Sequence, residues 1–258
     1  MYQLSEQIMM TWIGTFVWAF MRVYIVLMIM LVVGSRAVPE NYRVLLAVLL
    51  SWALMPIIPP VSGIELLSLE SIIVSGQQLL IGVFIGFTLL LVAAAVTFAG
   101  EAIAFAMGLG FASMVDPQNG NNTPVISQIF VITSTLIFLS LNGHIIVIGL
   151  IADSFVSMPI GVVGMGREEY WLMIKWSSRI FVVGLMIALP AIASIMLMNI
   201  GLGVITKVAQ QLNIFSIGFA INIFFGLFII ISILPVAMNA YMDFFMEGVR
   251  VIQELTSP

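Results

Sequence analysis

The sequence has 258 residues, of which 62% are hydrophobic and 8% are charged, with eight basic and twelve acidic side chains. A soluble globular domain carries about 25% charged residues, so this composition excludes a soluble enzyme and a disordered protein. The low number of Lys and Arg argues against nucleic-acid binding, which needs clustered cations to neutralise phosphates. We therefore expect an all-α, membrane-associated protein.

Apolar runs follow one another along the chain and predict helices, because a membrane-spanning helix needs about 20 mainly apolar residues. The predicted helices cover residues 12–33, 44–58, 72–98, 125–151, 170–198 and 214–238. A weaker helical stretch, 99–115, continues the third run, and a short amphipathic helix is expected after Asn239. The second run is too short for a full span. The alternation over about ten residues that marks a β-barrel strand is absent.

The basic residues do not settle an orientation in the membrane. If the six runs alternate, one side collects Arg36, Arg43 and Lys207, and the other collects Arg167 and Arg250. Three against two does not decide a topology under the positive-inside rule. Either the runs are miscounted or they are not ordinary spans laid side by side in lipid.

Several charges lie inside apolar runs. Arg22 is in the middle of the first run, where an arginine costs about 2.5–3.5 kcal/mol on insertion scales. We therefore expect Arg22 to face protein or water and not lipid. Lys175 and Arg179 are four residues apart and share a helix face. They either snorkel at a helix end or are buried against partner subunits or a water-filled conduit.

Small residues recur at helical spacing through the third run and beyond it. Gly82 and Gly86 form a GxxxG pair, and a stripe of alanines follows it. Such stripes let another backbone approach closely, although membrane helices are also rich in small residues for no special reason. We predict a subunit interface made of Arg22, Gly82, Gly86, Ala95, Ala99, Ala102 and Ala106.

The residues of metal and nucleophile chemistry are scarce. The chain has no cysteine and one histidine, His144, so a clustered metal site is not expected. HExxH, GxSxG and Walker A motifs are absent from the sequence. We expect neither an enzyme nor a bound cofactor. An intramembrane enzyme is the weakest of the alternative hypotheses for this reason.

The segment 107–128 changes character along its length. Its first part is small and apolar with two close glycines, and its second part is a polar loop. An irregular backbone cannot lie in hydrocarbon unless its polar groups are satisfied, so the segment should be buried in protein or line an aqueous cavity. A plain loop outside the membrane is the alternative.

This segment resembles the FliR family, flagellar biosynthetic proteins of the bacterial type III export gate, with their virulence-secretion counterparts. The matching letters are MGLGFA at 107–112, DPQ at 116–118, Ser127-Gln128 and NGH at 142–144. A second block looks similar at Leu189-Pro190, Asn199, 202–204 and 211–219. The resemblance covers essentially the whole chain. One departure is Ala209-Gln210-Gln211, where the family often has a proline.

The resemblance implies a non-enzymatic, pore-forming subunit that passes unfolded flagellar proteins across the inner membrane at the basal body. One copy would join FliP- and FliQ-like subunits in a closed helical ring, partly raised toward the periplasm, with FlhB- and FlhA-like components as further partners. The fold implied is one domain, 1–258, of helical hairpins, with a FliP-like part over roughly 1–185 and a FliQ-like part over roughly 186–258. The alternatives are a virulence export-gate subunit and an ion-coupled transporter, which should show paired broken helices.

The resemblance also implies that the segment 108–118 reaches into the pore and plugs it. In this hypothesis the glycines give the backbone freedom to be displaced, the large apolar side chains fill the constriction, and the polar residues hold the loop to partner helices. The predicted plug residues are Gly108, Leu109, Gly110, Phe111, Met114, Val115, Asp116, Pro117 and Gln118.

Overall fold

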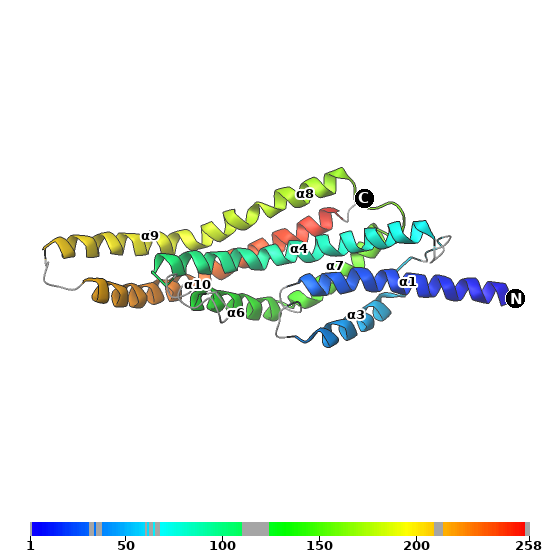
Figure 1. Ribbon diagram of the computed structural model, residues 1–258, viewed down its shortest axis with the longest axis horizontal. Coiled ribbons are helices and arrows are strands. Elements are labelled where there is room, and N and C mark those ends of the chain that lie inside the picture. The colour runs from blue at the N-terminus through cyan, green and yellow to red at the C-terminus, as the bar shows by residue number, and fades with distance from the viewer. Residues whose placement is uncertain are drawn as a thin grey trace. The chain divides into compact units, whose positions relative to one another are not determined.

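The computed structural model describes residues 2–30, 34, 38–59, 61, 64, 68–109, 124–208 and 214–255, and over these residues the chain is helical without a strand. The all-α prediction is confirmed. Figure 1 shows the helices of the described part, which are α1 (Tyr2–Ile29), α3 (Glu40–Leu54), α4 (Leu69–Ala106), α6 (Val125–Ser140), α7 (Gly143–Ser157), α8 (Arg167–Ser177), α9 (Arg179–Val208) and α10 (Ile214–Leu255).

Two predicted runs are each divided into two helices. The run 125–151 breaks at Asn142, which has φ 55° and precedes α7. Asparagine is among the few residues that enter this left-handed region readily. The run 170–198 breaks at a turn around Ser178. Ser177 donates its hydroxyl to the carbonyl oxygen of Met173 at 2.8 Å, and such local bonds compete with helix continuation.

Other predicted boundaries are absent. The third run and the stretch 99–115 are joined in α4, which is continuous to Ala106. The expected break after Asn239 was wrong, because α10 continues through it to Leu255. The helix also accommodates Pro235, so a proline inside this apolar sequence does not end the helix.

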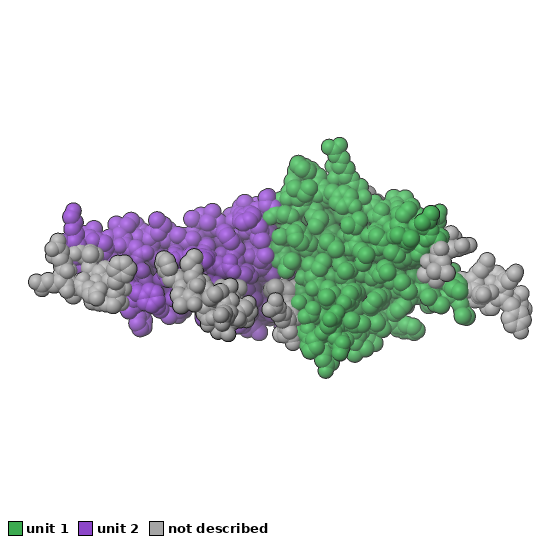
Figure 2. Space-filling view, in the orientation of Figure 1, with its two compact units in different colours: residues 1–91, 142–177, 246–258 green, residues 92–141, 178–245 purple. Residues whose placement is uncertain are grey.

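The chain divides into two compact units, which Figure 2 colours green and purple. Unit 1 contains residues 1–91, 142–177 and 246–258, and unit 2 contains residues 92–141 and 178–245. The family resemblance predicts instead one boundary near residue 185, between a FliP-like part and a FliQ-like part. The two compact units do not test that boundary, which stays a prediction.

In unit 1, α1 packs closely on α4 at two glycines. A Cβ atom on Gly82 would lie 2.8 Å from the carbonyl oxygen of Arg22, and one on Gly86 would lie 2.9 Å from Cβ of Ile29. The GxxxG pair therefore serves a helix contact within the chain. Helix α3 lies beside α1, where Phe16 and Trp52 meet edge to face with ring centroids 6.3 Å apart.

In unit 2, the second half of α4 is approached by α6 and α9. A Cβ atom on Gly100 would lie 2.5 Å from Cα of Ser127, and Ser127 donates its hydroxyl to the carbonyl oxygen of Thr97 at 3.0 Å. On α9, Gly184 packs against Phe98 of α4. Unit 2 is therefore also built on glycines that allow close approach.

Four candidates among the described helices are long and apolar enough to cross a membrane, or five if α6 and α7 together form one span. They are Met9–Ile29, Leu69–Ala106, Arg167–Ile205 and Gly218–Leu255. At about 1.5 Å per residue, the 38 residues of α4 extend about 57 Å. The hydrocarbon core is about 30 Å thick, so this helix is longer than a span requires.

The glycine contact between α1 and α4 gives a first prediction. Replacing Gly82 by Ala should lower the thermal unfolding temperature, because the new methyl group meets backbone at 2.8 Å. The matched control is Gly76→Ala in the same helix, where nothing lies within 4 Å of the new Cβ. Alanine there should stabilise the helix by about 0.5–1 kcal/mol. Thermal unfolding of both variants in lipid nanodiscs checks this, and equal effects at both sites would contradict the close packing.

Candidate functional site

The most unusual side chain in unit 1 is Arg22, which is charged and 0% exposed. Its Nε and Nη2 donate to Oε1 of Gln78 at 2.9 and 2.5 Å. Its Nη1 donates to the carbonyl oxygen and the hydroxyl of Ser154 at 2.7 and 3.1 Å. Nη2 also donates to the carbonyl oxygen of Met158 at 2.9 Å. The guanidinium has five N–H donors, so these bonds can satisfy every one of them.

Two of the acceptors belong to the end of a helix. Ser154 is in the last turn of α7, and Met158 follows directly after Ser157. The last carbonyl groups of a helix have no partner within it and carry the negative end of the helix dipole. A cation there is favourable, so Arg22 of α1 acts as a C-terminal cap for α7. Phe155 of the same turn lies under the guanidinium, with its ring centroid 4.2 Å from Cζ.

Gln78 supplies the acceptor from α4. Its amide oxygen accepts both bonds from Arg22, while its Nε2 has no hydrogen-bond partner in the part of the chain that the structure describes. Gln78 is itself 0% exposed. Among the described residues, the contacts of Arg22 therefore consist of neutral oxygens and an aromatic ring, with no carboxylate. This arrangement, which we call the Arg22 cluster (Arg22, Gln78, Ser154, Phe155 and Met158), joins α1, α4 and α7.

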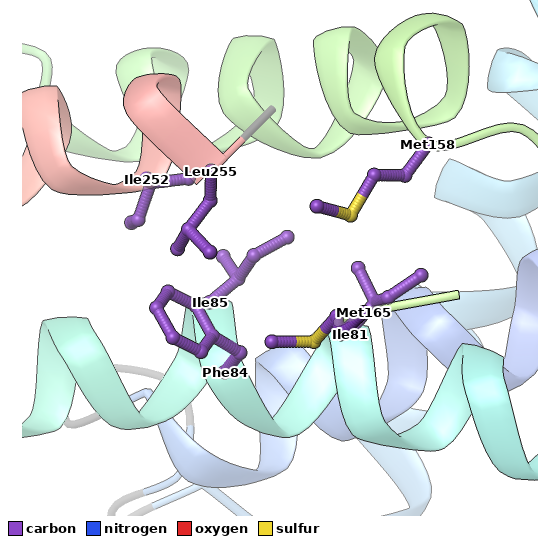
Figure 3. A pocket seen from close by; sticks show the side chains of 7 residues that line it. All are labelled: Ile81, Phe84, Ile85, Met158, Met165, Ile252 and Leu255. Carbon is purple, nitrogen blue, oxygen red and sulfur yellow. The ribbon is translucent and has the colours of Figure 1, made fainter. Parts of the chain in front are cut away.

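A small apolar crevice lies in the same unit. Its lining residues are Ile81, Phe84, Ile85, Met158, Met165, Ile252 and Leu255 (Figure 3). Met158 thus offers its carbonyl oxygen to Arg22 and its thioether to the crevice. All seven described side chains that line the crevice are apolar.

The predicted interface residues lie largely inside the chain. Arg22 is enclosed by its own unit, so the structure gives no support for the predicted contact of this side chain with another subunit. Ala95 and Ala99 are also fully buried, and the two glycines pack on α1. Ala102 and Ala106 are partly exposed and keep surface that a partner could cover.

The predicted plug begins where α4 ends. Gly108 donates its N–H to the carbonyl oxygen of Phe105 and Leu109 donates to that of Ala104, both at 3.0 Å. Gly108 has φ +81°. This is the paired hydrogen-bond pattern of a Schellman motif, which favours glycine at the left-handed position. The positive φ at the end of α4 therefore favours glycine at position 108. The hydrogen bonds of the motif fix the backbone conformation from which the predicted plug segment starts.

This end of α4 is held inside unit 2. Met107 is 0% exposed, and its side chain packs directly against Gly226 of α10. The other predicted plug residues lie outside the described residues: Gly110, Phe111, Met114, Val115, Asp116, Pro117 and Gln118.

Sequence reasoning missed the partners of Arg22. The polar stretch Ser75-Gly-Gln-Gln78 inside an apolar helix was a signal that could have found Gln78. The carbonyl oxygens of Ser154 and Met158 carry no side-chain signal. Within the described part of the chain, no three His, Asp or Glu side chains group together as a metal site.

The sequence matches a known protein family. The family described as bacterial export proteins, family 1, matches residues 13–248. A protein of Escherichia coli strain K12, the flagellar biosynthetic protein FliR, is 32% identical over 100% of this chain and 98% of its own length. Proteins of the same name from Pectobacterium carotovorum and Bacillus subtilis strain 168 are 34% and 28% identical, over 88% and 84% of this chain and 87% and 86% of their own lengths.

The Arg22 cluster predicts a large effect of a single substitution. Arg22→Met should lower the free energy of unfolding by about 2–6 kcal/mol, because it removes the donor to the amide oxygen of Gln78 and to the carbonyl oxygen of Met158, and each orphaned group costs about 1–3 kcal/mol. Arg250→Met on α10, where the arginine is exposed, is the matched control and should have little effect.

Adding Gln78→Met to Arg22→Met removes one of the orphaned groups. The double variant should therefore lose less stability than the sum of the two single variants. Chemical denaturation in detergent micelles provides these values. Wild-type stability of Arg22→Met would show that the arginine contributes nothing to the packing of unit 1.

Proposed function

The chain belongs to family 1 of the bacterial export proteins, the FliR family of flagellar export proteins, and from that premise we propose that it is a non-enzymatic, pore-forming subunit of the flagellar type III export gate. In this role it passes unfolded flagellar proteins across the inner membrane at the basal body. The family match over nearly the whole chain is the observation that carries the proposal. The flagellar names of the relatives favour this gate over its virulence-secretion counterpart.

The apolar surface of unit 2 supports assembly with other subunits. Large side chains of α10 stand exposed in the single chain, among them Phe224 at 77% and Ile231 at 72%. Helices α9 and α10 have 30 and 42 residues, or about 45 and 63 Å. These lengths exceed the hydrocarbon thickness of about 30 Å. The apolar side chains that extend past the hydrocarbon must be covered by other proteins. FliP- and FliQ-like subunits around one copy of this chain would cover them.

The loop after α7 supports the same view. Met158 binds Arg22, which lies well inside the apolar stretch Met9–Ile29 of α1. The irregular backbone from Met158 to Gly166 therefore starts at the depth of the middle of that stretch. Such backbone is not tolerated next to lipid. If the assembly is partly raised toward the periplasm, other subunits cover this irregular backbone and it does not meet lipid. FlhB- and FlhA-like components would be neighbours of such an assembly.

Closure of the pore is the second part of the proposal. The segment 108–118 acts as a steric plug whose large apolar side chains, Phe111, Met114 and Val115, exclude water and ions from a narrow passage. The end of α4 supports this role because its Schellman motif gives the segment a fixed starting point. A fixed base with glycines beside it lets the segment move aside without unfolding the helix that carries it.

Removal of the plug should open the pore. Deleting Gly110–Met114, in the complex co-expressed with FliP- and FliQ-like subunits, should make the inner membrane leak ions. Replacement of the same five residues by Gly and Ser should leak as well, because it removes the side chains that fill the passage. The matched control replaces the polar stretch Asn119–Thr123 by Gly and Ser and should stay tight.

Ion conductance of reconstituted complexes is the readout, and native mass spectrometry shows whether each variant still assembles. An unchanged conductance in a fully assembled deletion variant would contradict the plug. Failure of the wild-type chain to assemble with FliP- and FliQ-like subunits would contradict the proposed function itself.

A further inference from the structure

Glu101 is a charged residue in an otherwise apolar part of α4. It is the only charged side chain of that helix after the first turn, which contains Glu70. Glu101 is partly exposed, so its carboxylate lies at the surface of unit 2. A carboxylate on an apolar membrane helix is costly unless a cation, a polar group or water meets it. The carboxylate of Glu101 therefore needs a partner.

The side chains above and below Glu101 form one uncovered strip of α4. At spacings of three and four residues, it consists of Ala94, Thr97, Glu101 and Phe105. We call this strip the Glu101 face. All four side chains are at least partly exposed, and Phe105 is 62% exposed. The opposite side of the helix is buried, since the exposed fraction is at most 1% at Val96, Ala99 and Ile103.

The neighbouring helices of unit 2 pack on the two sides of the Glu101 face. Gly100 packs against Ser127 of α6, and Phe98 packs against Gly184 of α9. Successive residues are about 100° apart around a helix, so Phe98 and Gly100 lie on opposite sides of Glu101. Helices α6 and α9 therefore leave the Glu101 face open between them.

The chain itself does not supply a cation to this carboxylate. Among the described residues, Glu101 forms no hydrogen bond or ion pair. The described basic residues of unit 2 are Arg179 and Lys207, which lie near the two ends of α9. The segment 110–123, which follows α4, contains no basic residue. A cation that meets Glu101 should therefore come from another molecule.

The other side chains of the Glu101 face favour a protein helix as the neighbour. Ala94 and Thr97 are small and allow the backbone of another helix to approach closely. Thr97 donates its hydroxyl to the carbonyl oxygen of Ala93 at 3.0 Å. The exposed ring of Phe105 gains more from contact with protein than from contact with water. One carboxylate among small and apolar side chains is complementary to a helix with one basic residue in an apolar surface.

We propose that the Glu101 face receives a helix of another subunit and that a Lys or Arg of that helix forms an ion pair with Glu101. This inference rests on the assembly given above under the proposed function, and it adds the chemistry of one contact. Helix α4 ends at Ala106, shortly after Glu101. The ion pair would therefore hold the end of α4, from which the proposed plug starts, against a neighbouring subunit.

Photo-cross-linking identifies what covers the Glu101 face. Phe105 is replaced by p-benzoylphenylalanine, an aromatic residue of related shape, in the full complex co-expressed with FliP- and FliQ-like subunits. Irradiation should join position 105 to a helix of a partner subunit that has a Lys or Arg within about two turns of the joined residue. In an assembled complex, a cross-link to the chain itself, a cross-link to lipid or the absence of any cross-link would overturn the inference.

Reversal of the charges tests the ion pair. Glu101→Lys should lower the yield of assembled complex at least about tenfold, because it places two like charges together. Changing the identified basic residue of the partner to Glu should restore the yield. Glu70→Lys, in the exposed first turn of the same helix, is the matched control and should assemble like the wild type. Normal assembly of Glu101→Lys, or no restoration by the reversed partner, would overturn the pair.

Glu101→Gln separates assembly from folding. Because Glu101 has no partner among the described residues of its own chain, thermal unfolding of the isolated variant in detergent micelles should match the wild type. Native mass spectrometry should show weaker assembly of the same variant. Lower stability of the isolated chain would show that Glu101 acts within its own chain and would overturn the inference alone. Failure of the wild-type chain to assemble would instead contradict the proposed function.

Discussion

The packing of unit 1 depends on one buried cation. The guanidinium of Arg22 leaves α1 and binds the oxygens at the end of α7 and the amide oxygen of Gln78 on α4. Hydrogen bonds to a charged group are stronger than those between neutral groups, and an unsatisfied buried charge is strongly unfavourable. The three helices are therefore held in one register, because a shift of any of them leaves the cation or its acceptors without a partner.

The close approach of α1 to α4 follows from the same constraint. An arginine on α1 can reach Gln78 only if the two helices are close, and Gly82 and Gly86 provide that proximity by presenting no side chain. A charge in an apolar helix would be costly beside lipid. Here it is covered by protein, so α1 can be apolar on its other faces. The small residues and the arginine, which the sequence presents separately, belong to one packing arrangement.

The sequence predicted the helical class and the approximate position of most helices, because long apolar runs with proline or glycine at their ends leave few alternatives. It also predicted that the stretch after residue 98 continues the third run, as α4 does to Ala106, but it did not predict that α10 passes through Asn239. Nor could it predict the acceptors of Arg22. Backbone carbonyl groups are the same in every residue, and only the fold decides which of them point at the guanidinium.

In the single chain, Arg22 is held by Gln78, Ser154 and Met158 of the same chain, and we expect the same contacts in a complex with the proposed partner subunits. Solid-state NMR of the complex with partner subunits tests it, using ¹⁵N-arginine and serine labelled with ¹³C at the carbonyl, with the Arg22→Lys variant to assign the signal. We expect a dipolar coupling between the Arg22 guanidinium and the Ser154 carbonyl carbon, and slow exchange of the guanidinium protons with water. A guanidinium that exchanges freely with water and lacks this coupling would contradict it.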